Sequence, residues 1–136
     1  PEGPYQVQHD LQSMLQDLVG IVRVEDDMQK ALVGLGALRT RAARVAVPGN
    51  REFNPGWHTA LDLANLLTIS EAIARSALER RESRGGHFRD DYPVKDPAYA
   101  HFNTVVKRGE NGQMEVTRVP LPEMRDDLKQ IIEEEK

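Results

Sequence analysis

The sequence predicts an all-α fold, a three-helix up-down-up bundle followed by a C-terminal extension that contains a β-hairpin. Three long segments repeat apolar residues at helical spacing, and short connections join them, as in antiparallel bundles. Aromatic residues make up only 5% of the chain, which favours aliphatic packing between helices. We expect the bundle over residues 1–84 and, over residues 85–136, a charged elbow, the hairpin and a short C-terminal helix.

The composition is typical of one soluble globular domain. A chain of 136 residues is long enough to bury a core without disulfides. The net charge of −4 provides no basic footprint for nucleic acid, and no apolar run approaches the roughly 18 residues of a membrane span. The absence of cysteine excludes disulfides, thiolate metal sites and cysteine nucleophiles. Because the chain begins at Pro1 and is already close to a helical pattern, we expect it to be a piece of a longer polypeptide.

The first two predicted helices have amphipathic patterns. The first runs from about Tyr5 to Arg23. The second follows a break near Glu25 and ends at about Val47. Its apolar residues keep a spacing that packs at a shallow angle in antiparallel bundles. These residues are Met28, Ala31, Leu35, Leu38, Ala42 and Val45.

Two glycines, Gly34 and Gly36, lie inside the second helix. Each costs about 1 kcal/mol relative to alanine within a helix. They therefore imply either a close approach between helices or a local bend. A dinucleotide-binding loop is disfavoured, because the G-x-G has no third glycine and lies within a helical pattern.

The third helix is the longest and organises the rest of the chain. Asn54 is placed as its N-cap and Pro55 as its first residue, and we expect it to stop at Gly85-Gly86. Its apolar band is wider than the stripe of an ordinary surface helix, so it should pack against neighbours on two sides.

The C-terminal extension alternates in a strand-like way. Residues His101–Lys107 and Gln113–Val119 flank a Gly/Asn-rich loop and read as a β-hairpin. An isolated hairpin is marginal in water, so it should lean on the bundle or on a part that this chain lacks. Residues Glu123–Ile132 predict a short terminal helix.

The charged elbow, counted with the residues that lead into it, is residues 82–91. One interpretation is a helix C-cap, in which Gly85 is left-handed and Arg80, Arg81 and Arg84 meet the last carbonyls. The other is a contact surface, where paired glycines allow close approach and charged groups bridge to a partner. A metal site at His87, Asp90 and Asp91 is disfavoured because no second histidine lies nearby. No nucleophile or two-histidine motif occurs, so we predict no catalytic, cofactor-binding or metal-binding residue in this chain.

Residues 54–93, NPGWHTALDLANLLTISEAIARSALERRESRGGHFRDDYP, carry a family resemblance. They contain A-L-D-L at residues 60–63 and E-S-R-G-G-H at residues 82–87, followed by Arg89, Asp91, Tyr92 and Pro93. This pattern resembles the C-terminal helical domain of the succinate dehydrogenase/fumarate reductase flavoprotein subunit family. L-aspartate oxidase has a similar stretch, but Arg89 and Asp91 favour the succinate/fumarate branch.

The resemblance implies an oxidoreductase subunit whose FAD-binding and capping domains precede this bundle. In the parent subunit, FAD-dependent succinate/fumarate interconversion would occur there, and the isolated chain would be inactive. Implied partners are the FAD-binding domain of the same polypeptide, an iron–sulfur subunit and membrane anchor subunits, without nucleic acid or direct membrane insertion. The implied location is cytoplasmic, with the complex peripheral on the cytoplasmic face of the inner membrane. The residues expected to contact the FAD-binding domain are Glu82, Ser83, Arg84, His87, Arg89 and Asp91.

Two alternatives to this assignment stay open at this point. One is the C-terminal domain of L-aspartate oxidase or a related flavoprotein. The other is a free-standing helical module that binds other proteins through the charged elbow. A self-contained metalloenzyme ranks below both.

Overall fold

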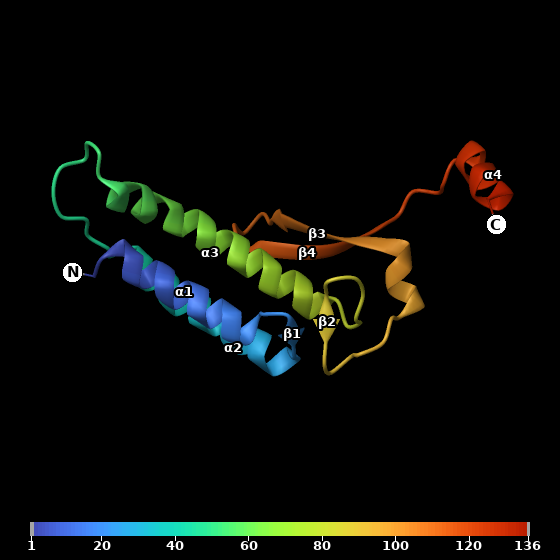
Figure 1. The fold of residues 1–136 in the computed structure, drawn as a ribbon, viewed down its shortest axis with the longest axis horizontal. Coiled ribbons are helices and arrows are strands. Elements are labelled where there is room, and N and C mark those ends of the chain that lie inside the picture. The colour runs from blue at the N-terminus through green and yellow to red at the C-terminus, as the bar shows by residue number, and fades with distance from the viewer. Residues whose placement is uncertain (1, 136) are drawn as a thin grey trace.

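The computed structural model describes residues 2–135 and consists of three long helices, a hairpin and a separate terminal helix. Helices α1 (Pro4–Leu18), α2 (Glu25–Ala42) and α3 (Pro55–Glu79) pack side by side in alternating directions (Figure 1). The predicted up-down-up bundle with a C-terminal hairpin is therefore confirmed.

The bundle core consists of aliphatic side chains from all three helices. Their burial supplies the main driving force for packing. One cluster lies toward the α2–α3 loop and contains Val7, Leu11, Leu35, Leu38, Leu63 and Leu67. The other lies toward the elbow and contains Val19, Met28, Ala31, Ala74 and Ala77.

All three helices end earlier than the sequence pattern predicts. The first stops at Leu18, because Val19 makes the last helical bond and the chain turns at Gly20 into strand β1 (Val22–Arg23). The second stops at Ala42, not Val47, after which the Ala46 N–H donates to the Glu2 carbonyl of the neighbouring segment. The third stops at Glu79, short of the glycine pair.

Gly34 and Gly36 differ in their surroundings. A Cβ on Gly34 would lie 2.3 Å from the Met14 sulfur on α1, whereas a Cβ on Gly36 would meet nothing within 4 Å. The predicted close helix approach is confirmed at Gly34. Nothing in the packing around Gly36 requires a glycine.

The extension pairs β3 (Phe102–Arg108) with β4 (Met114–Pro120) as an antiparallel hairpin, within about one residue of the predicted strands. A short 3-10 helix, η1 (Pro97–His101), leads into it. The hairpin leans on α3, where Arg118 Nε donates to Glu79 Oε1 at 2.6 Å. The α3 helix therefore has neighbours on two sides, as its wide apolar band predicts.

The predicted C-terminal helix forms as α4 (Asp126–Glu134). It stands apart from the bundle in Figure 1, and all of its residues are exposed. Among residues 2–135, no helix combines the length and apolar character needed to cross a bilayer.

Candidate functional site

The charged elbow folds into a compact loop at the end of α3. Arg84 and His87 exchange backbone hydrogen bonds of 2.8 and 3.0 Å across a two-residue glycine turn, in which Gly85 has φ +59°. Strand β2 (Phe88–Arg89) then pairs in parallel with β1. Gly85 is left-handed, as the C-cap interpretation requires. It serves this turn, however, and not the helix end, so that interpretation is wrong.

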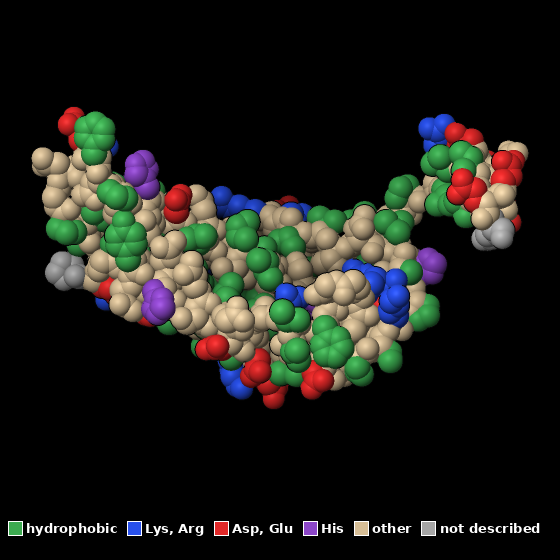
Figure 2. Space-filling view, viewed as in Figure 1, with side chains coloured by type: hydrophobic (Ala, Val, Ile, Leu, Met, Phe, Trp, Pro, Cys, Tyr) green, Lys and Arg blue, Asp and Glu red, His purple; other side chains and the backbone are tan. Residues whose placement is uncertain are grey.

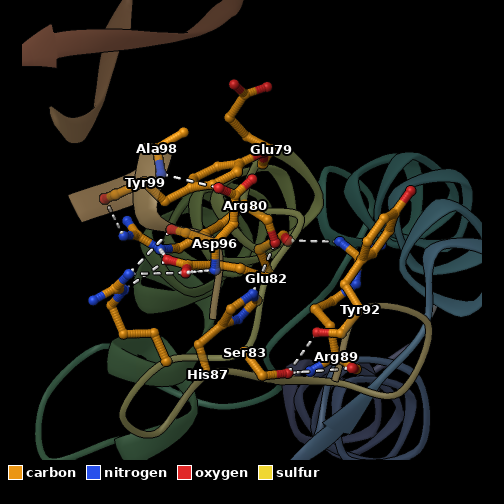
Figure 3. Close-up of polar contacts among 12 residues, drawn as sticks. Glu79, Arg80, Glu82, Ser83, His87, Arg89, Tyr92, Asp96, Ala98 and Tyr99 are labelled. Atoms are coloured by element: carbon orange, nitrogen blue, oxygen red, sulfur yellow. Dashed lines mark hydrogen bonds and ion pairs between the residues drawn. The ribbon is translucent and has the colours of Figure 1, made fainter. Parts of the chain in front are cut away.

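Glu82 is the buried anion of the elbow. Its side chain is fully buried and accepts a hydrogen bond from Arg80 Nε at 2.9 Å (Figure 3). It also accepts one from Arg84 Nε at 2.8 Å. The backbone N–H of Asp96 donates to the same carboxylate at 2.9 Å. These donors, Arg84 foremost, outweigh the cost of burial and lower the pKa of Glu82 to about 2.

Arg89 is the buried cation. Its Nε and Nη2 each lie 2.6 Å from one oxygen of Asp91, and Nη1 donates to the carbonyls of Ala77 and Leu78 at 3.0 and 3.3 Å. The exposed carbonyls at the end of α3 are therefore satisfied by Arg89 and, at Glu79, by the Tyr99 hydroxyl at 3.2 Å, and not by the predicted Arg80, Arg81 or Arg84. The paired guanidinium is the main reason that the pKa of Asp91 falls to about 2.

Ser83 and His87 complete the network. The Ser83 hydroxyl accepts from the Arg89 N–H and donates to the Tyr92 carbonyl, both at 2.8 Å. Arg23 Nη1 lies 3.0 Å from His87 Nδ1, and because a guanidinium only donates, Nδ1 must accept. The proton then resides on Nε2, which donates to the Arg80 carbonyl at 3.0 Å. Burial is the largest cause that lowers the pKa of His87, so the ring is held neutral.

The structure thus brings all six predicted residues into one network, and each of them is bridged within this chain. Sequence reasoning missed the partners Arg23, which lies in β1, and Glu25, which is the first residue of α2. Glu25 donates its backbone N–H to Asp91 Oδ2 at 2.9 Å over a separation of 66 positions. No local pattern signals such a contact. Among the described residues, no group of three histidine or acidic side chains is arranged to hold a metal ion.

The outward side of the elbow is the glycine turn with its flanks. Gly85 and Gly86 are exposed, the Arg84 side chain is 34% exposed, and Phe88 is 37% exposed. The hydrogen-bonded residues Glu82, Ser83, Arg89 and Asp91, of which Glu82 and Arg89 are buried, lie behind this surface and fix its shape. The arrangement presents a rigid projection and offers no free nucleophile or paired acid and base.

Comparisons with known proteins agree on one family. The family described as "Fumarate reductase flavoprotein C-term" matches residues 8–131. The fumarate reductase flavoprotein subunit of Mycobacterium tuberculosis is 32% identical over 116 residues, which is 85% of this chain and 20% of that protein. The succinate dehydrogenase flavoprotein subunit of Coxiella burnetii is 36% identical over 108 residues, which is 79% of this chain and 18% of that protein.

A solved structure shows the same fold. A chain of the Mycobacterium smegmatis Sdh1 structure in complex with UQ1 has a TM-score of 0.87 and 43% identity, and covers 98% of this chain and 23% of that one. This chain spans about a fifth of the length of the relatives it matches. It belongs to the succinate dehydrogenase/fumarate reductase flavoprotein subunit family, and it corresponds to the C-terminal domain of those subunits.

Proposed function

We propose that this chain is the support domain of an FAD-dependent flavoprotein subunit that interconverts succinate and fumarate. It docks on the FAD-binding domain of the same polypeptide. The parent subunit passes electrons to an iron–sulfur subunit, and membrane anchor subunits hold the complex on the cytoplasmic face of the inner membrane. The family membership of residues 8–131 supports this assignment.

The residues of this chain do not form a site that fits FAD. Its single G-x-G, at Gly34 and Gly36, lies inside α2, where Gly34 packs against Met14. A dinucleotide site needs such glycines in a turn between a strand and a helix, where the backbone can approach the pyrophosphate. The chain therefore supplies no group to the redox reaction, and alone it is inactive.

The observation that carries the proposal is the internally satisfied elbow. Its charged residues hold a glycine turn at a fixed position at the end of the bundle, and a rigid projection loses little entropy when it docks. Within this proposal Arg84 and His87 flank the contact with the FAD-binding domain. Glu82, Ser83, Arg89 and Asp91 hold the backbone in the shape that fits it.

The test uses the full-length parent subunit with Arg84→Ala. Arg84 is replaced because Glu82 still keeps Arg80 and the Asp96 N–H when Arg84 is removed. We expect a lower flavin-to-protein ratio after purification and a lower melting temperature. Arg81→Ala is the matched control, because Arg81 is the neighbouring arginine with a side chain 57% exposed and only a 3.8 Å contact to Glu25. Unchanged flavin content and melting temperature for Arg84→Ala would refute the role of the elbow.

A further inference from the structure

An open groove of about 480 Å³ lies beside the elbow, between α3, the end of β1 and strand β3. Ile69 and Ile73 line it from α3, Thr104 lines it from β3, and Arg23 and His87 lie along it as well. His87 belongs to both the groove and the elbow. The two features therefore form one continuous surface.

The floor of the groove is an apolar stripe that the bundle leaves uncovered. Ile69 and Ile73 lie about one turn apart on α3, line the groove and are 61% and 43% exposed. Figure 2 shows hydrophobic side chains gathered over the middle of the molecule, where α3 and the hairpin lie in Figure 1. A continuous apolar strip of this kind on a soluble domain indicates a contact surface.

Arg23 brings a positive charge without a counter-ion to the groove. Its Nε donates to the Gly20 carbonyl at 2.8 Å and its Nη1 to the neutral His87 ring. Among the described residues, no carboxylate lies within ion-pair distance of Arg23, although burial already lowers its pKa. A partly buried guanidinium is normally matched by an anion, so this site lacks its complement.

Thr104 provides a second, independent sign of a missing partner. Its hydroxyl oxygen is buried and has no hydrogen-bond partner in the described part of the chain. Buried hydroxyls in folded proteins are almost always hydrogen-bonded. The groove thus offers an apolar floor and an unmatched cation, and the unsatisfied Thr104 hydroxyl is buried in its wall.

We propose that the groove receives an aliphatic segment of the same parent subunit that carries a carboxylate side chain, and that this carboxylate pairs with Arg23. The inference rests on the proposed function and extends its docking surface from the elbow along α3. The segment should carry an acidic residue because Arg23 is positively charged. It should belong to the FAD-binding domain because the groove is continuous with the elbow, where that domain is proposed to dock. The relatives are roughly five times as long as this chain, so most of the parent polypeptide is available to supply the segment.

Cysteine labelling tests whether the groove is covered. The chain has no cysteine of its own, so a thiol introduced into it is unique among its peptides and can be followed in the full-length subunit by mass spectrometry of the labelled peptide. We expect the Ile73→Cys thiol to react at least about tenfold more slowly than the Val33→Cys thiol, because docking buries only the first. Val33 is the matched control, since it lies on α2 and is 78% exposed. Equal rates would show an open groove and overturn the proposal.

The charged contact is tested by replacing Arg23 in the Ile73→Cys background. We expect Arg23→Gln to raise the labelling rate of the groove thiol several-fold and Arg23→Lys to raise it less, because lysine keeps the charge. The rate at Val33→Cys should not change, which separates loss of the ion pair from general loosening of the bundle. Equal effects of the two Arg23 replacements would show that no anion is held there.

A photo-crosslinking amino acid at Ile69 identifies the occupant in the assembled complex. We expect a cross-linked peptide from the preceding part of the same subunit, aliphatic and with an aspartate or glutamate. A cross-link to another subunit or to a second copy, or no cross-link, would overturn the assignment. Failure of the elbow test is distinguishable, since Arg84→Ala can leave flavin content unchanged while the groove thiol stays protected.

Discussion

The buried guanidinium of Arg89 donates two hydrogen bonds of 2.6 Å to Asp91, and this pair joins two helix ends. On one side Arg89 donates to the last carbonyls of α3, and on the other Asp91 accepts the first N–H of α2 at Glu25. The cation thus meets the negative end of one helix dipole and the anion meets the positive end of the other.

Arg89→Leu should destabilise the 136-residue chain by about 3 kcal/mol, because Asp91 and two carbonyls of α3 lose their hydrogen-bond donor. Arg81→Leu, an exposed neighbour, should change the free energy of unfolding by less than about 0.5 kcal/mol. Denaturant titration of both variants measures the difference. Similar small losses for the two would show that Arg89 is not the link between the helix ends.

Acid should unfold the protein through the two carboxylates of the elbow that are paired with arginine. The folded-state pKa of both Glu82 and Asp91 is about 2, below the ordinary values of 4.5 and 3.8. A lowered pKa contributes stability that is present above the ordinary value and is lost as pH falls toward the folded value. We therefore expect the melting temperature to fall steeply between about pH 4.5 and pH 2.

Glu82→Gln tests the assignment of that acid transition. At neutral pH the free energy of unfolding of the variant should be about 2 kcal/mol lower, because an amide NH₂ would face Arg80 and Arg84. Between about pH 4.5 and pH 2 the free energy of unfolding of the variant should fall less steeply than that of the unmodified chain. The two curves of free energy against pH should therefore converge in acid. Parallel curves would mean that Glu82 does not titrate in this range.

His87 should add a second pH dependence at higher pH. Its pKa is lowered below 6.5, so the neutral ring favours folding, and that stability is lost as pH falls below 6.5. His87→Gln can still accept from Arg23 and donate to the Arg80 carbonyl without titrating. Its unfolding free energy should therefore vary less between about pH 6.5 and pH 5 than that of the unmodified chain. An identical slope in this interval would contradict the neutral-ring assignment.

The glycines of α2 form a matched pair. Gly36→Ala should stabilise the chain by roughly 0.5–1 kcal/mol, because the new methyl meets open space and alanine favours helix. Gly34→Ala gains the same propensity but must displace Met14, so it should be at least about 1 kcal/mol less stable than Gly36→Ala. Thermal or denaturant unfolding measures the stability of the two variants. Equal stabilisation would show that α1 and α2 do not approach closely at Gly34.

The sequence predicted the bundle because aliphatic periodicity is a local signal that tertiary packing reinforces. It placed the end of α3 too late because the groups that satisfy its last carbonyls are distant in the sequence. Arg89 and Tyr99 donate to carbonyls in the last turn of α3 after the chain has turned back, and α3 stops at Glu79. Periodicity alone contains no information about such caps.

The six elbow residues were also predicted from the sequence, through the family resemblance, as contacts with the FAD-binding domain, and that role stays a prediction. Their partners were not predicted. Arg23 reaches His87 across 64 positions and lies in a two-residue strand that no pattern in its own segment announces. The groove beside the elbow could not be predicted from the sequence either, because its shape depends on how the hairpin packs against α3.

The flavin-to-protein ratio of the parent subunit, expressed without the segment described here, tests the central claim most directly. We expect flavin to be largely lost from the shortened subunit and to be regained when the 136-residue chain is supplied in trans. A shortened subunit that keeps its full complement of flavin without the added chain would contradict the role of this domain as a support for the FAD-binding domain.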